Sequence, residues 1–322
     1  MDNIVTQLKS CRNVLIASHI NPDGDAIGSL VAMGVALQTY GIDTTLFNES
    51  PIPAVYRFLP GVERISRTLE GETFDTAIVL DCSNLDRVGS RADQVSAVPV
   101  VINIDHHVTN NGFGDLQIID SSACATAEIV YRLVKAMDVE INKTMAISIY
   151  TGIVTDTGSF RFSNTNHAAF TICDEMVQKG VQPYNVAKHV YGTYSLGRIK
   201  LLNLALESIE ISKNGTVSMM MLTQQMLNDT GTNPEDADGL INYARRIEDV
   251  KVAALIHEQK NGSHVQGSAK EYHVSLRSDG SVDVAAIASG FGGGGHPSAA
   301  GFGIKTTLSN LKHKIIQLSE TI

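Results

Sequence analysis

Four clusters of aspartate and histidine in the first half of the chain have the residue types of a metal-binding site. The first cluster starts at His19 and includes the carboxylates Asp23 and Asp25. Pro22 and Gly24 favour a tight turn between them, so the three side chains could converge on one point. The alternative is that Asp23 or Asp25 only caps the helix expected directly after the turn.

The other clusters follow apolar runs of the sequence. They are Asp81, the adjacent Asp105, His106 and His107, and Asp156. Asp81 and Asp105 come directly after runs that read as buried strands, whereas Asp156 closes a run that reads as a helix. The alternatives are a turn aspartate at Asp81, core or solvated histidines in the third cluster, and a helix cap at Asp156.

Aspartates with a minority of histidines and no thiolates are typical of a site for hard divalent ions. Manganese or magnesium fits such a donor set better than structural zinc, and the histidines favour manganese. Two ions about 3.5–4 Å apart can activate water, polarise a phosphoryl oxygen and stabilise the leaving oxygen. The clusters therefore indicate hydrolysis of a phosphate ester without a covalent intermediate.

These clusters need elements that bring them together. We expect strands at 13–18, 43–47, 75–80 and 99–104, and helices at 26–40 and 125–137. Such alternation predicts an α/β fold with a parallel sheet and helices on both of its faces. Ligands of these sheets gather outside the carboxyl ends of the strands, where three of the four clusters lie.

The rest of the chain predicts a second, smaller α/β domain. Further helices are expected at 146–155, 167–179 and, without an obvious break, 185–206; strands at 217–222, 250–257 and 271–277 follow, with a helix near 236–246 and a turn-rich segment at 260–268. We expect a catalytic domain at 1–184, a helical connector at 185–212 and a substrate-binding domain at 213–322. A chain of 322 residues with 43% hydrophobic content supports two domains.

The net charge of −9 lacks the basic excess expected of a protein that follows a long phosphate backbone. A nucleic-acid ligand should therefore be short. No leader and no apolar run of roughly 18 residues is evident, so we expect a cytoplasmic protein without a membrane partner. The four cysteines are widely spaced and predict neither disulfides nor a zinc site. A homodimer is compatible with this sequence.

A glycine-rich run near the end of the chain is the other candidate site. Gly293, Gly294 and Gly295, followed by His296, suit a phosphate or a nucleotide edge, because glycines expose backbone N–H groups. A helix expected at 284–289, just before the run, argues against a dinucleotide-binding fold. A flexible linker is the alternative.

Arginines are further candidates for contacts with a phosphate. Arg277 follows an alternating strand and could give a charge-assisted contact to a terminal phosphate of the substrate. The alternative is an ordinary surface arginine. Arg87 and Arg161, close in sequence to Asp81 and Asp156, are weaker candidates of the same kind.

The clusters together resemble the motifs of the DHH phosphoesterase superfamily. The name-giving motif stands at Asp105, His106 and His107, with the other motifs in the expected order around it. The segment 292–301 is similar to the glycine-rich signature of the DHH-associated domain, so the resemblance covers nearly the whole chain. Within the superfamily, the type most similar in length is the bifunctional oligoribonuclease and phosphatase of adenosine 3′,5′-bisphosphate (pAp).

The resemblance implies a role for each matching residue. His19, Asp23 and Asp81 would hold one metal ion; Asp25, Asp81, His106 and Asp156 would hold the other, with Asp81 bridging the two. His107 would face the scissile phosphate and Asp105 would orient a neighbouring imidazole. The implied substrates are short RNA and pAp. Alternatives are linear dinucleotides from cyclic-dinucleotide signalling, inorganic pyrophosphate, and nucleotide binding without catalysis.

Overall fold

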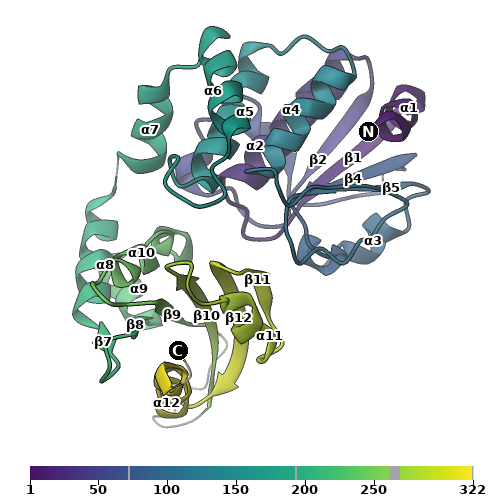
Figure 1. The fold of residues 1–322 in the computed structure, drawn as a ribbon. Helices are drawn as coiled ribbons and strands as arrows, with labels where there is room; N and C mark the ends of the chain where they lie inside the picture. Colours follow the sequence, from purple (N-terminus) through teal and green to yellow (C-terminus); the bar gives the residue numbers. More distant parts are fainter. Residues whose placement is uncertain (72, 193, 261–268, 321) are drawn as a thin grey trace. The chain divides into compact units, whose positions relative to one another are not determined.

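The computed structural model describes residues 1–71, 73–192, 194–260, 269–320 and 322. The chain divides into two units, Met1–Thr193 and Tyr194–Ile322, which are drawn in Figure 1. The division falls inside the predicted connector, 185–212.

The first unit is built on a parallel sheet of six strands in the order β3-β2-β1-β4-β5-β6. The strands are β1 (Asn13–Ser18), β2 (Asp43–Phe47), β3 (Ile65–Ser66), β4 (Thr76–Leu80), β5 (Val101–Asp105) and β6 (Leu116–Ile119). The predicted parallel sheet is confirmed, and its four predicted strands are the four central ones. The edge strands β3 and β6 are short and were not predicted.

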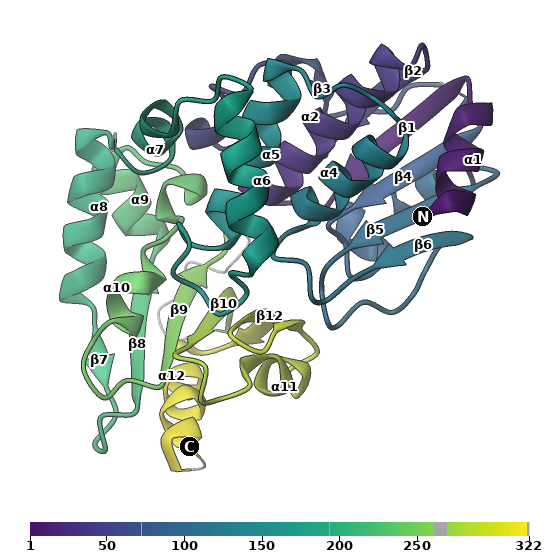
Figure 2. The same ribbon diagram turned by 45° about the horizontal axis from the view of Figure 1, so that its top comes forward.

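Helices cover the two faces of this sheet unequally. One face carries α1 (Asp2–Ser10), α2 (Gly24–Thr39), α4 (Thr126–Ala136), α5 (Lys143–Asp156), α6 (His167–Gln178) and α7 (Pro183–Tyr191), as Figure 1 and Figure 2 show. The other face packs against α3 (Ala92–Ser96) and the 3-10 helix η3 (Leu85–Val88). Alternate residues of β1 point to opposite faces. Val14 and Ile16 pack on the first face, and Leu15 and Ala17 pack on the second.

Glycines let α2 and α5 approach closely. A Cβ atom on Gly28 would lie 2.4 Å from the backbone oxygen of Ser148, and one on Gly24 would lie 2.4 Å from Oγ1 of Thr155. Only glycine therefore fits at these two positions of α2. The contact brings the first turn of α2 beside the last turn of α5, and these turns carry two of the candidate metal ligands.

The predicted continuous helix at 185–206 is wrong. Helix α7 ends with Gly192 as its C-cap, and α8 (Leu196–Glu207) begins after Ser195, whose side chain accepts a hydrogen bond from the backbone N–H of Arg198. A glycine at a helix end and a serine at a helix start are common termination and initiation residues, and here they separate two helices.

The second unit is a mixed sheet in the order β11-β12-β10-β9-β8-β7, antiparallel except for the parallel pair β8 and β9. Its strands are β7 (Glu210–Ile211), β8 (Val217–Leu222), β9 (Val252–Glu258), β10 (Lys270–Ser278), β11 (Gly294–His296) and β12 (Ala299–Thr306). The predicted strands correspond to β8, β9 and β10. Residues 261–268 of the predicted turn-rich segment lie outside the described residues.

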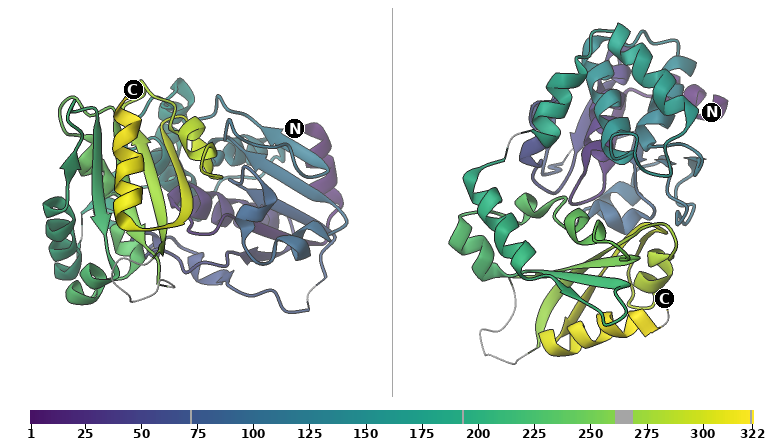
Figure 3. Two further views of the ribbon diagram at one scale, coloured as in Figure 1. Left: turned by 90° about the horizontal axis from the view of Figure 1, so that it is seen from below. Right: turned by 60° about the vertical axis from the view of Figure 1, so that its left-hand side comes forward.

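Two layers of helices cover the second sheet, as Figure 3 shows. One contains α11 (Val284–Ser289) and α12 (Leu308–Gln317); the other contains α8, α9 (Gln224–Thr230) and α10 (Ile241–Arg245). The predicted helix near 236–246 is a 3-10 turn, η4 (Pro234–Ala237), followed by the short α10. Among the described residues, no helix is both long and apolar enough to cross a bilayer.

Candidate metal centre

Three neighbouring strand ends form the floor of the first candidate site. The last residue of β1 pairs with the last residue of β4, Leu80, and Leu80 pairs with Ile104, the residue before the last one of β5. His19 and Asp81 follow directly after the paired positions of their strands, and Asp105 stands at the corresponding position of β5. The parallel register therefore places these side chains in one row at the carboxyl edge of the sheet.

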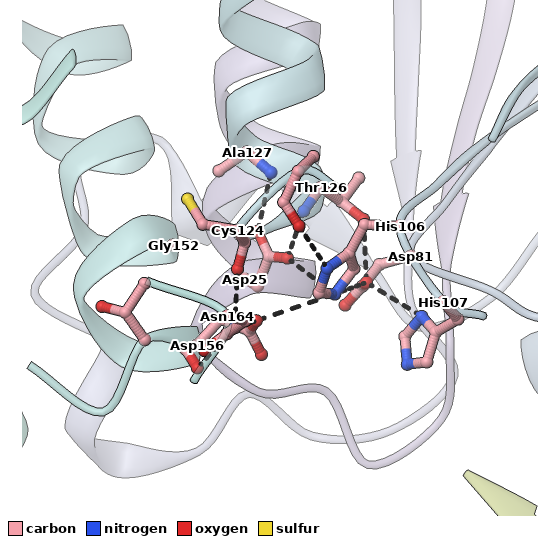
Figure 4. A network of polar contacts seen from close by, with 12 residues as sticks. Asp25, Asp81, His106, His107, Cys124, Thr126, Ala127, Gly152, Asp156 and Asn164 are labelled. Carbon is pink, nitrogen blue, oxygen red and sulfur yellow. Dashed lines mark hydrogen bonds and ion pairs between the residues drawn. The ribbon is translucent and has the colours of Figure 1, made fainter. Parts of the chain in front are cut away.

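Asp81 lies at the centre of the histidines (Figure 4). Its Oδ2 is 3.4 Å from Nε2 of His19, and its Oδ1 is 3.7 Å from Nε2 of His106 and 3.6 Å from Nδ1 of His107. The Thr126 hydroxyl donates a hydrogen bond of 2.9 Å to the same Oδ1. Burial alone would raise the pKa of Asp81, but the His19 hydrogen bond and the histidine charges hold it well below its usual value.

His19, Asp23 and Asp81 form a first group, whose ligand atoms all lie within 4.8 Å of one another. Asp23 also caps α2, since its Oδ1 accepts hydrogen bonds of 3.0 Å from the backbone N–H groups of Asp25 and Ala26. The helix cap considered as the alternative is therefore present at Asp23. The cap uses only Oδ1, so the other carboxylate oxygen can still bind a metal ion.

Asp25 does not cap its own helix; it caps another one. Its Oδ2 accepts a hydrogen bond of 2.6 Å from the backbone N–H of Thr126, and its Oδ1 accepts one of 2.8 Å from that of Ala127. Helix α4 starts at this point, and its own N-cap residue is an alanine without a capping oxygen. The helix N-terminus thus holds a buried carboxylate in place.

His106 lies among three carboxylates. Its Nε2 is 3.9 Å from Oδ2 of Asp25, 3.7 Å from Oδ1 of Asp81 and 3.7 Å from Oδ2 of Asp156. Donors bound to one divalent ion by bonds of about 2.0–2.2 Å lie roughly 3–4 Å apart, so this second group fits an ion. The Nδ1 atom lies 3.3 Å from the carbonyl oxygen of Ala123, which directs Nε2 toward the carboxylates.

The pKa values of the second group show how strongly its charges interact. Burial raises the pKa of Asp25 well above its usual value, and the Asp81 and Asp156 charges add to this. Burial likewise raises the pKa of Asp156 to about 7. For His106, burial lowers the pKa, but the neighbouring carboxylates outweigh it and raise the pKa to about 9. Protons held by such a group are what a divalent cation would replace.

Asp105 orients the imidazole of His107. The Asp105 side chain is fully buried, and its Oδ1 accepts a hydrogen bond of 2.6 Å from Nδ1 of His107. Its Oδ2 accepts one of 2.6 Å from the side-chain amide of Asn110. Burial would raise the pKa of Asp105, but the His107 hydrogen bond lowers it. Asp105 is therefore a charged group that fixes the tautomer and direction of the His107 ring.

Several polar residues of the centre were not predicted from the sequence. They are Thr126, which contacts Asp25 and Asp81, Asn110, which contacts Asp105, and Asn164, whose Nδ2 donates a hydrogen bond of 2.8 Å to Oδ2 of Asp156. Only Thr126 had a sequence signal, since it lies in the first turn of the helix predicted at 125–137, directly after a run of small residues. Burial lowers the pKa of His19, but the hydrogen bond to Asp81 outweighs it and the pKa is raised; of the weaker arginine candidates, Arg87 lies near enough for its charge to oppose this increase. Arg161 is exposed.

Two candidate residues of the second unit, Arg277 and His296, pair with the same residue of a neighbouring strand. Arg277 on β10 and His296 on β11 both pair with Ala299 of the intervening strand β12. Directly paired residues point to the same face of a sheet, so these two side chains lie on one face, separated by two strand spacings.

The glycine-rich run is part of this sheet. A Cβ on Gly293 would lie 2.1 Å from the backbone oxygen of Gly301, and one on Gly295 would lie 2.5 Å from that of Ala299. Gly295 also has a φ of +144°. Gly294, at the start of β11, has open space around it. The flexible-linker alternative is therefore wrong, because the glycines allow a close strand-to-strand approach.

Comparison with known proteins agrees with this architecture. Residues 13–153 match the DHH family, N-terminal domain, and residues 214–321 match the DHHA1 domain. A bifunctional oligoribonuclease and PAP phosphatase NrnA of Thermus thermophilus is 33% identical over 91% of this chain and 84% of its own length. The protein of the same name from Bacillus subtilis is 27% identical over 90% of this chain and 89% of its own length.

Solved structures of other proteins have the same fold. An exopolyphosphatase-related protein from Bacteroides fragilis has a TM-score of 0.88 and 27% identity, and the match covers 98% of this chain and 95% of that one. RecJ from Thermus thermophilus, solved in complex with Mn²⁺, shares the fold with a TM-score of 0.55 and 12% identity, over 99% of this chain and 54% of that one.

The fold and the site define a hydrolase of phosphate esters with a centre that fits divalent metal ions. The chain belongs to the DHH family.

Proposed function

We propose that the protein hydrolyses short oligoribonucleotides to mononucleotides and pAp to AMP, using two divalent ions. The observation that carries this proposal is the position of Asp81 between the two ligand groups, within 3.4 Å of His19 and 3.7 Å of His106. The names of the Thermus thermophilus and Bacillus subtilis relatives support the choice of substrates.

The proposed ligands follow the two groups. His19, Asp23 and Asp81 hold one ion; Asp25, Asp81, His106 and Asp156 hold the other, with Asp81 shared. The distances within each group support this assignment. Carboxylates with one histidine in each group favour Mn²⁺ over Mg²⁺ as the resident ion.

Each side chain then has a task in hydrolysis. When bound, a pair of divalent ions lowers the pKa of a water molecule and neutralises charge on a phosphoryl group. Asp105 accepts a hydrogen bond from Nδ1 of His107, which leaves Nε2 of the ring to face the scissile phosphate. Asp25, held by the first N–H groups of α4, keeps its position as the charge around it changes.

Substrate recognition is assigned to the second unit. Arg277 and His296, which lie on one face of the sheet on either side of Ala299, bind the phosphate or base at the far end of a short substrate. The N–H groups of Gly294 and Gly295 add further donors, whereas the N–H of Gly293 already donates to the carbonyl oxygen of Ala288. The acidic net charge of −9 gives little attraction for long strands.

A cytoplasmic location is part of this proposal. The four cysteines are all buried and free, as suits a reducing compartment. The absence of a membrane-spanning helix from the described residues is compatible with the same location.

A comparison of initial rates tests the substrate assignment. Purified protein with Mn²⁺ is offered a diribonucleotide, a 5-mer, a 24-mer, pAp and pyrophosphate. We expect fast release of mononucleotides from the two short RNAs, AMP from pAp and little attack on the 24-mer. Pyrophosphate as the best substrate would make the protein a pyrophosphatase, and binding of nucleotides without turnover would make it a binding module.

A further inference from the structure

One loop between β6 and α4 contacts one proposed ligand of the second ion directly and a second one through Asn164. The carbonyl oxygen of Ala123 lies 3.3 Å from Nδ1 of His106. The next carbonyl, that of Cys124, accepts a hydrogen bond of 2.8 Å from Nδ2 of Asn164, which also donates to Oδ2 of Asp156 (Figure 4). The position of this loop therefore affects two ligands on different elements.

The hydrogen bonds that Nδ2 donates fix the orientation of the Asn164 amide, although its Oδ1 is buried and has no hydrogen-bond partner among the described residues. Leaving a buried acceptor without a partner is unfavourable. Rotating the amide would place its oxygen against the Asp156 carboxylate, so the donor role at Asp156 determines the orientation.

Glu128 holds the loop from the other side. Its side chain is buried, and Oε2 accepts hydrogen bonds of 2.8 Å from the backbone N–H of Cys124 and 2.9 Å from Nδ2 of Asn166. Asn166 also donates to the carbonyl oxygen of Ser122 and caps α6. One carboxylate thus ties the loop to the segment that carries Asn164.

A helix cap alone does not account for this arrangement. Glu128 lies in the first turn of α4 and reaches back to the N–H of Cys124, one residue before the N-cap Ala125, whereas a capping-box glutamate bonds the N–H of the N-cap residue itself. A cap needs no partner from another segment. The bond to Asn166 adds one, and that segment continues to the amide that holds Asp156.

We propose that Glu128 is a positioning residue for the ion held by Asp25, His106 and Asp156, acting through the Ala123–Cys124 carbonyls and Asn164. Of the other ion's ligands, His19 and Asp23 belong to that ion alone, and neither has such a link to Glu128 among the hydrogen bonds of the described residues. This inference rests on the proposed two-ion centre and deepens it, since it predicts that the two sites respond differently to one substitution.

The test measures Mn²⁺ binding to metal-free protein by titration calorimetry and by the spin-resonance signal of free Mn²⁺. We expect Glu128→Ala to weaken one of two Mn²⁺ sites about 10- to 100-fold and to leave the other within about twofold. Glu128→Gln keeps an oxygen acceptor and should lose less. Raising the Mn²⁺ concentration should restore the kcat of Glu128→Ala, which a general folding defect would not allow.

The matched control is Glu175→Gln. Glu175 also links α6 to α4, by accepting a hydrogen bond of 2.5 Å from the Tyr131 hydroxyl, but it contacts no candidate ligand. Both Mn²⁺ sites should remain unchanged in this variant. If Glu128→Ala does not fold, Asn164→Ala decides, because it removes the amide beside Asp156 and leaves the cap of α4 in place.

Two results would overturn the proposal: equal weakening of both sites in Glu128→Ala and Asn164→Ala, or no weakening of either site. A wild-type protein that binds fewer than two Mn²⁺ ions would instead contradict the two-ion centre itself. The stoichiometry of the wild type therefore separates failure of the proposed function from failure of the Glu128 assignment.

Discussion

Asp25 caps a helix that begins 101 positions later, because its carboxylate accepts a hydrogen bond of 2.6 Å from the backbone N–H of Thr126. The same Oδ2 faces His106 at 3.9 Å. One side chain therefore joins the first turn of α2, the first turn of α4 and the proposed second ion. A substitution that displaces one of these three groups should therefore displace the other two.

The first prediction concerns Asp81→Asn. Asp81 has a φ of +59°, which asparagine adopts more readily than most residues, so the fold should be retained. Loss of the shared carboxylate should lower hydrolysis of a diribonucleotide more than tenfold, a barrier increase above about 1.4 kcal/mol. Asp81→Ala should lose as much activity and also some stability, because alanine is strained at this φ.

Initial rates at saturating Mn²⁺ and thermal melting curves check this prediction. Activity above about a tenth of wild type in Asp81→Asn would contradict the shared role of the carboxylate.

The second prediction concerns Gly152→Ala in α5. The added Cβ would lie 2.7 Å from Cβ of Ala127 and 3.0 Å from Oδ1 of Asp25. Crowding of a packed core costs about 1–3 kcal/mol, and here it should also displace a proposed ligand. We expect a lower melting temperature together with weaker Mn²⁺ binding. The control is Gly303→Ala, where an added Cβ meets nothing within 4 Å. Equal Mn²⁺ affinity in the two variants would contradict this account of the helix contact.

The third prediction concerns metal removal. Exhaustive chelation should abolish hydrolysis, and added Mn²⁺ should restore it more fully than added Mg²⁺, because the ligand set contains imidazoles. Metal analysis of the chelated protein is the control. Full activity from protein shown to be free of metal would rule out the two-ion mechanism.

The fourth prediction is a pH dependence of Mn²⁺ binding. The carboxylates around His106 raise its pKa to about 9 in the metal-free protein, so at lower pH an ion must displace a proton from its ring. Affinity at the second site should therefore rise with pH and level off above about pH 9. Below about pH 7, protonation of Asp156 adds a second proton to displace.

Calorimetric titrations at several pH values, in buffers of different ionisation enthalpy, measure both the affinity and the protons released. An affinity that did not change over this pH range, with no proton release, would show that the ion does not bind at His106.

The fifth prediction concerns substrate length. Arg277→Ala or His296→Ala should lower kcat/KM for a diribonucleotide by about tenfold or more, the loss expected for one charge-assisted hydrogen bond of about 1.5–3 kcal/mol. A generic phosphodiester such as p-nitrophenyl phenylphosphonate, which has no second end to hold, should be much less affected. Similar losses on both substrates would show that these residues do not measure length.

The positions of the metal-centre candidates could be anticipated because their strands are regular. The runs 76–80 and 100–104 are apolar except for Thr76 and Asn103, as suits central parallel strands, and each is followed by an aspartate. Once these strands are parallel neighbours, their carboxyl ends must meet. Asp81 and Asp105 therefore follow from the pattern, although the left-handed backbone of Asp81 does not.

Other parts of the centre could not be anticipated. Asn164 and Glu128 act through contacts between segments 38 to 40 positions apart, and both are residue types that are common on protein surfaces. The edge strands β3 and β6 are too short to show a pattern. By contrast, Gly192 and Ser195 are typical residues of a helix end and a helix start, and they could have predicted the break between α7 and α8. The apolar pattern that continues on either side favoured one helix instead.

The cap that Asp25 provides for α4 also determines when the second ligand group can form during synthesis of the chain. When β1 and the first turn of α2 have been synthesised, Asp25 still lacks the N–H groups of Thr126 and Ala127, and Asp156 is later still. A nascent chain stopped before α5 carries some metal-binding side chains but no formed second group. Because domains fold as units during synthesis, ion uptake at that group must wait until the helices of the first unit are complete.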